Sequence, residues 1–367
     1  MRTYVFSTLR ALVHSHCRLR LITLCGVVAL FLALSNNLCL AQEEEKRTPT
    51  ERQSNRPPRV QTAPARPAPD APDETLRIDT DLVLVDVTVT DADGRPVRDL
   101  HEQDFKLYED AVERPISFFN VERKGGAARP IAVVFAVDVS GSMTPAEVER
   151  LREALVVFTQ DLAEHQAVFA LMTFGMNVKT LQTFTRDSKK LDRALDRLTR
   201  EPNGLSTHAY DAVDDAIRLL SRHAPRTRER RLLKRAVIVV TDGFPVGDTV
   251  APQTVIERAN AADVSVYTVT LPSFSRLMVS TEQRPLPTPL DVSGLVERTG
   301  GMNVYATDKD FAPLFHALAE DVTSSYVLAF YPTEEKRHDG RVHTIRVTAP
   351  PGLLLRQSRE TYQSNDK

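Results

Sequence analysis

Three short polar segments of this 367-residue chain carry the side chains best suited to chemistry. The first contains Asp138, Ser140 and Ser142, the second contains Thr207, and the third contains Asp242. Each of these side chains offers oxygen, and none of them offers sulfur or an imidazole nitrogen. Because carboxylates, hydroxyls and water suit a hard cation, the set predicts Mg²⁺ first, with Mn²⁺ or Ca²⁺ as alternatives.

The charge of this set predicts what such a cation would bind. The two carboxylates must offset the repulsion from nearby helix N-termini, and the three hydroxyls are neutral. A divalent ion held in this way stays short of negative charge and favours an external carboxylate in its last coordination position. We therefore expect a partner protein to supply an Asp or Glu. The alternative interpretation is ordinary turn and capping chemistry, which Ser, Thr and Asp all favour.

The elements around these segments predict how they could meet. Residues 131–137 and 236–240 are almost continuously apolar, as in strands buried on both faces of a sheet. Asp138 directly follows the first run, and the second runs into Thr241-Asp242-Gly243. A turn at 203–211 brings Thr207 to the start of a helix. In an open parallel sheet, ligands bind beyond the carboxyl ends of the strands, where the strand order reverses. We expect the polar segments to lie at that edge.

The remaining pattern predicts an α/β fold. Thr144, Pro145 and Glu147 form a capping box and helix start, followed by an apolar stripe of helical period up to Leu162. Strands and helices then alternate, which indicates a doubly wound, mostly parallel sheet with helices on both faces. The further strands expected are 168–174, 178–184, 264–271 and 304–305, and the further helices are 213–220, 255–262, 290–298 and 311–322.

These segments carry a family resemblance. Asp138-Val139-Ser140-Gly141-Ser142, Gly204 to Asp211 and Thr241-Asp242-Gly243 resemble the three loops of a von Willebrand factor type A domain, over residues 129–325. The resemblance implies a Rossmann-like sheet and a metal-ion-dependent adhesion site. In that family the first Asp, both Ser, the Thr and the later Asp coordinate Mg²⁺ directly or through water, and all five are matched here. His208 and Phe244 are candidates for the rim that contacts a partner.

Two β-rich segments flank the α/β part, at 76–128 and 326–362, before a short tail at 363–367. Residues 83–90 alternate with period two, which predicts a half-buried strand, and shorter strands are expected at 105–108 and 116–121. Strands at 326–331 and 342–348 flank an Asp339-Gly340 turn, which favours a hairpin. Because neither segment is large enough alone, we infer a split β domain with the α/β domain inserted. The flanks resemble those of exported bacterial proteins with a related type A domain.

The N-terminal region predicts export. Residues 1–41 contain four arginines, no acid, an apolar run at 21–34 and a small residue, Ala41, at the end, which is typical of a signal peptide. The alternative is an uncleaved anchor. Residues 42–75 hold seven of the 23 prolines and predict a disordered linker. All three cysteines lie within 1–41, so cleavage leaves a thiol-free protein with no membrane insertion, located in a periplasm, on a surface or in the medium.

Charge and loops narrow the functions further. A net charge of −2, or −6 without residues 1–41, gives no case for nucleic-acid binding. A basic stretch precedes the strand at 236–240 and is either a solvated connection or a patch for an acidic partner or lipid headgroups. The loop at 272–289 follows a strand's carboxyl end, where it either shapes ligand choice or is a variable insertion. The basic stretch before residue 236 consists of Arg222, Arg226, Arg228, Arg230, Arg231, Lys234 and Arg235.

No enzymatic motif competes with the metal site. Ser140 does not lie in a G-x-S-x-G turn, and the chain has no H-E-x-x-H or phosphate-binding loop. The sequence therefore predicts a non-enzymatic, exported, metal-dependent protein-binding or adhesion module. The alternative is a structural or assembly component of the cell envelope. In that case the metal only stabilises the fold, and partners bind the β segments or the basic stretch.

Overall fold

The computed structural model describes residues 82–121, 128–140, 144–198, 206–225, 227–228, 231–271, 287–306 and 311–364. The signal peptide and linker predicted for 1–75 lie outside these residues, as do Ser142, Gly204 and most of the loop at 272–289. Among the described helices, none is both long enough and apolar enough to cross a bilayer.

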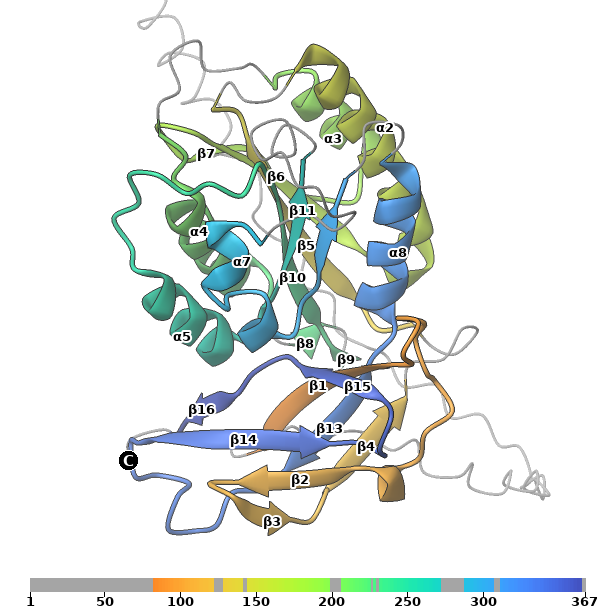
Figure 1. Ribbon diagram of the computed structural model, residues 1–367, viewed down its shortest axis with the longest axis vertical. Coiled ribbons are helices and arrows are strands. Elements are labelled where there is room, and N and C mark those ends of the chain that lie inside the picture. Colours follow the sequence, from red (N-terminus) through yellow and green to blue (C-terminus); the bar gives the residue numbers. More distant parts are fainter. Residues whose placement is uncertain are drawn as a thin grey trace, which may run out of the picture. The chain divides into compact units, whose positions relative to one another are not determined.

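A six-stranded sheet forms the centre of the α/β domain (Figure 1). Its order is β12-β11-β10-β5-β6-β7, and every neighbouring pair is parallel except β6 with β7. From β5 the chain adds β6 and β7 on one side, and from β10 it adds β11 and β12 on the other. The strand order therefore reverses between β5 and β10. The strands are β5 (Ile131–Asp138), β6 (Val168–Phe174), β7 (Lys179–Thr185), β10 (Lys234–Thr241), β11 (Ser265–Thr270) and β12 (Asn303–Tyr305).

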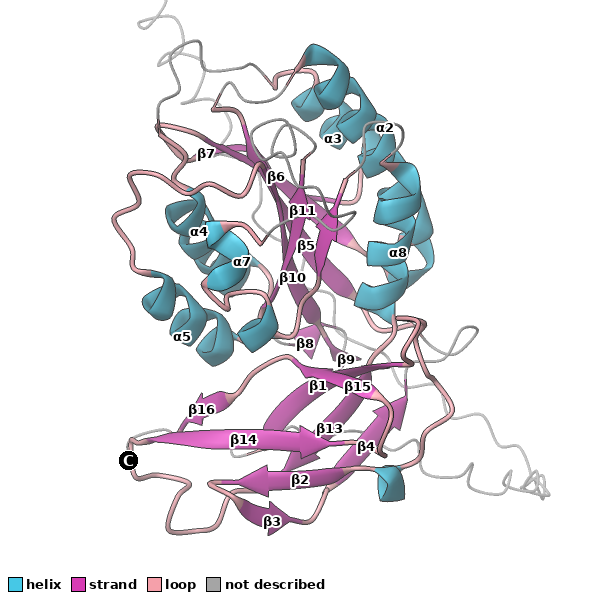
Figure 2. Cartoon of the chain, in the orientation of Figure 1, coloured by secondary structure: helices cyan, strands magenta, loops and turns pink. Residues whose placement is uncertain are grey.

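Helices cover both faces of this sheet, as the sequence predicts (Figure 2). One hydrophobic core joins the sheet to α2, α3 and α8, and a second joins its other face to α4, α5 and α7. Alternate residues of β5 point into the two cores because a strand has a side-chain period of two. The helices are α2 (Pro145–Asp161), α3 (Ser188–Leu195), α4 (Ala209–His223), α5 (Pro252–Ala262), α7 (Pro289–Val292) and α8 (Ala312–Thr323), with short 3₁₀ turns η3 (Ala163–His165) and η4 (Glu297–Thr299).

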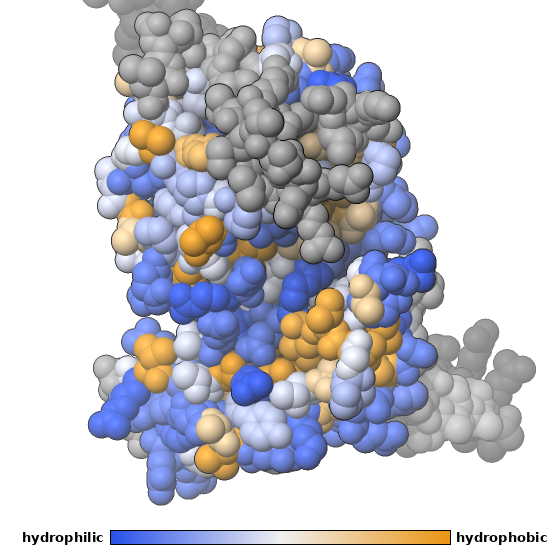
Figure 3. All heavy atoms as spheres, viewed as in Figure 1, coloured by the Kyte–Doolittle hydropathy of each residue, from blue (hydrophilic) through white to orange (hydrophobic). Residues whose placement is uncertain are grey.

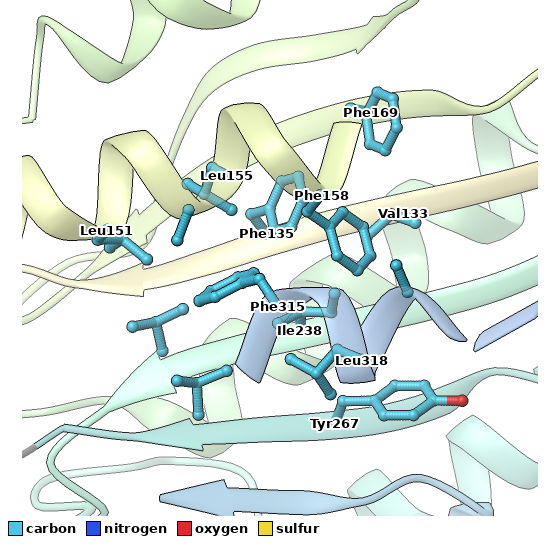
Figure 4. Packing of buried hydrophobic residues seen from close by; sticks show 14 of the residues in the cluster. Val133, Phe135, Leu151, Leu155, Phe158, Phe169, Ile238, Tyr267, Phe315 and Leu318 are labelled. Atoms are coloured by element: carbon cyan, nitrogen blue, oxygen red, sulfur yellow. The ribbon is translucent and has the colours of Figure 1, made fainter. Parts of the chain in front are cut away.

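Aromatic side chains fill the first of these cores (Figure 4). Phe158 of α2 lies edge-on to Phe135 of β5 at 5.5 Å and to Phe315 of α8 at 6.1 Å between ring centroids. Edge-to-face pairs at this spacing contribute beyond their buried area. The start of α2 is fixed as predicted, because Thr144 and Glu147 form both hydrogen bonds of a capping box. This face of β5 is thus packed against α2 and α8.

The two flanking β segments pack together into a second β-rich part, here called the β unit. One sheet has the order β15-β1-β13-β4, and the other has the order β16-β14-β2-β3. Strands from before and after the α/β domain pair directly, including β1 with β13 and β2 with β14. The strands are β1 (Val83–Thr90), β2 (Lys106–Glu109), β3 (Val112–Arg114), β4 (Phe118–Val121), β13 (Tyr326–Phe330), β14 (Val342–Thr348), β15 (Leu354–Gln357) and β16 (Thr361–Gln363), with a 3₁₀ turn η2 (Glu102–Asp104).

The hairpin predicted around Asp339-Gly340 is wrong. β13 pairs with β1 and β4, whereas β14 pairs with β2 and β16 in the other sheet. β13 is buried on both faces and β14 on only one, so the two strands suit different positions. The intervening segment carries the chain from one sheet to the other, and its Asp339 binds side chains instead of closing a two-stranded turn.

The half-buried strand predicted at 83–90 is buried on both faces in the structure. Asp86 points away from the apolar core and forms a two-oxygen contact with Arg129, with both distances 2.8 Å. Arg129 lies two residues before the start of β5, and its Nε donates to the carbonyl of Leu232. Asp86 therefore faces the α/β domain, not solvent. This contact lies at the amino end of β5.

Other predictions fail for local reasons. The helix expected at 290–298 ends with α7 at Val292, because Gly294 adopts a positive φ of 74° before the 3₁₀ turn η4. The helix α3 and the strands β3, β15 and β16 were not predicted, nor was the two-stranded pair β8 (Thr227–Arg228) and β9 (Arg231–Leu232).

Two places in the chain depart from the usual pattern of buried apolar and exposed charged side chains. Lys234 and Arg235 are only 3% and 4% exposed, so this end of the basic stretch is neither a solvated connection nor an accessible patch. In the β unit, apolar side chains gather in the region of β15 (Figure 3), where Leu354 is 61% exposed. Leu353 and Leu355 beside it are half-buried against the core of the β unit.

Candidate metal centre

Asp138 closes β5 and is completely buried. Its Oδ1 accepts a hydrogen bond from the backbone of Ser140 at 2.8 Å, and its Oδ2 accepts one from Thr241 Oγ1 at 2.9 Å. The parallel register pairs Val137 with Val240, so Asp138 and Thr241 stand at the same level in adjacent strands. The sheet itself therefore holds the first carboxylate against the end of β10.

The turn after β10 carries the second carboxylate. Asp242 Oδ1 accepts from the backbone of Phe244 at 3.1 Å, and Gly243 donates to Thr241 Oγ1 at 3.1 Å. Gly243 has φ of +85°, and a Cβ there would lie 2.5 Å from the Thr288 side chain. Only glycine fits this position without displacing Thr288, the N-cap of α7. The turn directs Asp242 to the carboxyl edge of the sheet.

Thr207 reaches the same edge through backbone pairing. It exchanges two 2.9 Å hydrogen bonds with Val246, which follows the Asp242 turn, and His208 donates to the carbonyl of Gly175 at 3.2 Å. Thr207 and Ser140 are each 7% exposed, whereas Asp242 is half-buried. The end of β5 supplies Asp138, and loops at the same edge supply Ser140, Thr207 and Asp242. Ser142 lies outside the described part.

The surroundings of Asp138 and Asp242 disfavour their negative charges. Burial raises the pKa of Asp138 to about 6, and the negative charge of Asp242 acts in the same direction against hydrogen bonds from Ser140 and Thr241. In the described part of the chain, no basic side chain forms an ion pair with Asp138 or Asp242. Two carboxylates held close without a cationic partner are costly unless a cation is added.

The donor set fits a hard cation. Its described members offer two carboxylates and two hydroxyls at one edge, all of them oxygen. No group of three or more His, Cys, Asp or Glu that could hold a metal occurs among the described residues, so the set depends on hydroxyls as well as acids. Sites of this composition suit Mg²⁺, Mn²⁺ or Ca²⁺ better than a soft metal.

The two rim residues have different surroundings. His208 Nδ1 lies 3.0 Å from Asp211 Oδ2, and its ring packs over Gly247, with Nε2 3.0 Å from where a Cβ would stand. Phe244 is half-buried beside Asp242. His208 therefore contributes to the loop's packing, in addition to its position next to Thr207.

No role was predicted from the sequence for three residues that support the site, Thr241, Asp211 and Asp248. Thr241 holds both Asp138 and the Asp242 turn, and the register of β5 with β10 could have indicated it. Asp211 and Asp248 connect the Thr207 loop to the Asp242 loop. No pattern in the sequence indicates that contact, because it joins side chains to the backbone of a segment 37 to 39 residues away.

Comparison with known proteins places the α/β domain in a family context. A model described as "von Willebrand factor type A domain" matches residues 132–282. Inter-alpha-trypsin inhibitor heavy chain H4 of Sus scrofa is 31% identical over 127 residues, which are 34% of this chain and 13% of that protein. Matrilin-3 of Gallus gallus is 28% identical over 147 residues, 38% of this chain and 31% of that protein. The matches span well under two thirds of either relative.

Solved structures match the same region. The conserved hypothetical protein BatB of Bacteroides thetaiotaomicron is 16% identical with a TM-score of 0.39, covering 53% of this chain and 97% of that one. Proximal thread matrix protein 1 from the mussel byssus, described with a zinc-occupied MIDAS motif, is 12% identical with a TM-score of 0.42. That match covers 58% of this chain and 49% of that one.

Proposed function

Because the α/β part of this chain is a von Willebrand factor type A domain, we propose that the protein binds a divalent cation at the carboxyl edge of β5 and β10 and uses it to hold an acidic side chain of a partner protein. The pair of carboxylates at the strand-order reversal carries this proposal. Asp138 and Asp242 lie where open α/β sheets bind ligands, and within the described residues they lack a basic partner.

Each residue of the site has a role under this proposal. Asp138 and Asp242 supply the negative charge, and Ser140, Ser142 and Thr207 supply neutral oxygens directly or through water. Mg²⁺ is the first candidate, with Mn²⁺ or Ca²⁺ as alternatives. When bound, the cation provides a coordination position that an Asp or Glu of the partner can take. His208 and Phe244 would contact the partner beside that position.

Export and architecture complete the proposal. We infer that residues 1–41 direct export, that 42–75 form a linker, and that the β unit (76–128 and 326–362) flanks a domain at 129–325. The Arg129–Asp86 contact supports this arrangement, since it joins the β unit to the amino end of β5, whereas Asp138 lies at the other end of the strand.

Metal binding tests the site directly. Titration of the full mature chain with Mn²⁺, followed by calorimetry, should give one binding event that Asp138→Ala and Asp242→Ala each abolish. Partner capture from envelope extract should then require the metal and be lost both in EDTA and in Asp138→Ala. Unchanged Mn²⁺ binding in both variants would refute the site, and capture that persists in EDTA would refute the metal-dependent mechanism.

A second candidate function is a structural or assembly role in which the β unit binds the partner and the metal only stabilises the fold. The apolar side chains exposed in the region of β15 favour it, above all Leu354. Exposed apolar patches of this kind mark interaction surfaces. Under this function, Leu354→Ser abolishes capture, whereas Asp242→Ala lowers only the melting temperature. Capture that survives Leu354→Ser argues against it.

A further inference from the structure

A reciprocal set of hydrogen bonds joins the loop of Thr207 to the loop of Asp242. The side chain of Asp211 accepts from the backbone of Thr249 at 3.0 Å, from its hydroxyl at 3.0 Å and from the backbone of Val250 at 2.9 Å. In return, the side chain of Asp248 accepts from the backbone of Asp211 at 3.0 Å. We call these contacts, with the Thr207–Val246 bridge, the seam.

The seam replaces an ordinary helix cap. Residue 208 is the N-cap of α4, but its side chain makes no capping hydrogen bond, and an acid at the third helical position usually reaches back to the N-cap amide. Here that amide donates to Gly175, and Asp211 turns to the 249–250 backbone instead. The backbone amide of Asp211, in the first turn of α4, instead donates to Asp248, which lies in the loop after Asp242. The start of α4 therefore depends on the segment that follows Asp242.

This dependence fixes two proposed ligands relative to each other. Thr207 directly precedes the N-cap of α4, and its backbone bonds to Val246, four residues after Asp242. The hydrogen bonds of Asp211 and Asp248 hold the two loops together in addition to the Thr207–Val246 bridge. Burial would raise the pKa of Asp211, but the hydrogen bonds from His208, Val250 and Thr249 outweigh it and lower the pKa. Asp211 is thus a charged acceptor whose side chain is only 16% exposed.

We propose that Asp211 is a positioning residue of the metal site: through its hydrogen bonds to Thr249 and Val250, it holds Thr207 and Asp242 at the spacing that a divalent cation requires. This inference rests on the proposed function, because it assigns a role at the same site. Asp211 does not contact the cation in this role. Residues that orient metal ligands in this way commonly change metal affinity when they are substituted.

Three variants separate geometry from charge. Asp211→Ala removes both the acceptors and the charge, Asp211→Asn removes the charge but keeps an oxygen for the backbone donors, and Asp215→Ala removes a charge from an exposed position on the same helix. Mn²⁺ affinity is measured by electron paramagnetic resonance on the full mature chain. We expect about tenfold or greater weakening in Asp211→Ala, recovery to near wild type in Asp211→Asn, and no change in Asp215→Ala.

Amide hydrogen exchange in EDTA gives a readout without metal. In Asp211→Ala, the amides of Thr249 and Val250 should lose protection, whereas those of β5 should not. Equal affinities in Asp211→Ala and wild type would overturn the inference alone, and so would equal weakening in Asp211→Asn and Asp211→Ala, since charge would then account for the effect. If wild type does not bind Mn²⁺, the proposed function fails, and the exchange result still decides whether Asp211 holds the two loops.

Discussion

Asp138 in the α/β domain and Asp110 in the β unit each accept several hydrogen bonds, but of the two only Asp110 has cationic partners among the residues that the structure describes. Burial raises the pKa of Asp138 to about 6, and its hydrogen-bond donors are backbone and hydroxyl groups. Burial would also raise the pKa of Asp110, but Lys336, Thr344 and His343 outweigh it, and the pKa is lowered. The same residue type is thus disfavoured as an anion in one region and favoured in the other.

The β unit gathers its charges into a closed network. His343 lies between Asp110, at 2.8 Å from Nδ1, and Asp339, at 3.1 Å from Nε2. The side chain of the neighbouring Glu109 is completely buried, and it binds Arg114 at 2.8 Å and accepts from the Tyr362 hydroxyl. These residues come from β2, β3, β14, β16 and the segment before β14. Every acid in this network meets a cation or a hydroxyl supplied by the chain itself.

The difference between the two regions indicates which of them is suited to bind an added cation. A network that pairs its own charges avoids the cost of an uncompensated buried charge and leaves no coordination for a ligand. The edge at β5 and β10 places two acids together without such pairing in the described residues, which is costly unless a cation arrives. Stability and binding should therefore respond in opposite ways to the loss of an acid in each region.

The largest expected effect is the loss of the paired acid. Glu109→Ala leaves Arg114 and Lys336 without their buried partner and should lower the free energy of unfolding by about 3–5 kcal/mol. Urea denaturation measures this, and Mn²⁺ affinity of the folded protein should not change. The matched control is Glu113→Ala, whose exposed contact with Lys106 at 3.8 Å should cost about 1 kcal/mol or less. Similar losses in both variants would contradict the comparison.

Loss of the Asp138 charge should have the opposite effect to Glu109→Ala: weaker metal binding without a loss of stability. Asp138→Asn keeps an acceptor for the Ser140 amide but removes the charge, and it should weaken Mn²⁺ binding about a hundredfold or more, which is about 2.7 kcal/mol. Its stability in EDTA should equal or exceed that of wild type, because the lost charge has no basic partner in the described residues. Calorimetry and melting in EDTA measure the two quantities. A clear fall in stability without metal would show that charged Asp138 is stabilised by the fold itself.

The third prediction concerns pH and the β unit. Burial would lower the pKa of His343, but Asp110 and Asp339 outweigh it, and the pKa is raised. The stabilisation from charged His343 is therefore complete below about 6.5, the ordinary histidine value, and is lost as pH rises through the raised pKa. The free energy of unfolding, measured by urea denaturation at increasing pH, should fall in wild type by up to about 2 kcal/mol and stay level in His343→Gln. Parallel pH profiles would exclude His343 as the cause.

At low pH, protonation of Asp110 and Asp339 should reduce the stability of the β unit. The pKa values of Asp110 and Asp339 are lowered, so their contribution is present above about 3.9 and is lost as pH falls through the lowered values. His343→Gln removes one partner of each acid, and it should therefore also reduce the acid-side dependence. A variant that changes only the alkaline side would show that Lys336, Thr344 and Ser364 are sufficient for the two acids.

Sequence periodicity predicted the α/β domain and the edge of the candidate site well. Uninterrupted apolar runs of seven and five residues before Asp138 and Asp242 indicate strands buried on both faces, and the carboxyl ends of neighbouring parallel strands must meet. Capping residues at Thr144 and Pro145 predicted the start of α2 for an equally local reason. At these positions a residue's surroundings follow from its neighbours in sequence, and the prediction succeeded.

Predictions failed where distant segments decide the structure. The choice of sheet for β13 and β14 depends on β1 and β2, more than 200 residues earlier, so a local hairpin signal at Asp339 was misleading. The burial of Asp86 depends on Arg129, which no periodicity relates to it. Likewise, Asp211 resembles a helix cap in sequence, and only the fold brings Thr249 to it.

The smallest expected effect tests a neutral ligand of the metal edge. Thr207→Val keeps the shape of the buried side chain and the backbone bridge to Val246 but removes the hydroxyl. One lost neutral oxygen should weaken Mn²⁺ binding roughly tenfold, or about 1.4 kcal/mol, which is less than the loss of either carboxylate because no charge is removed. Thr207→Ser keeps the hydroxyl and should bind nearly as well as wild type. If both variants bind equally well, the hydroxyl is not a ligand, and Thr207 belongs to the edge only through its backbone.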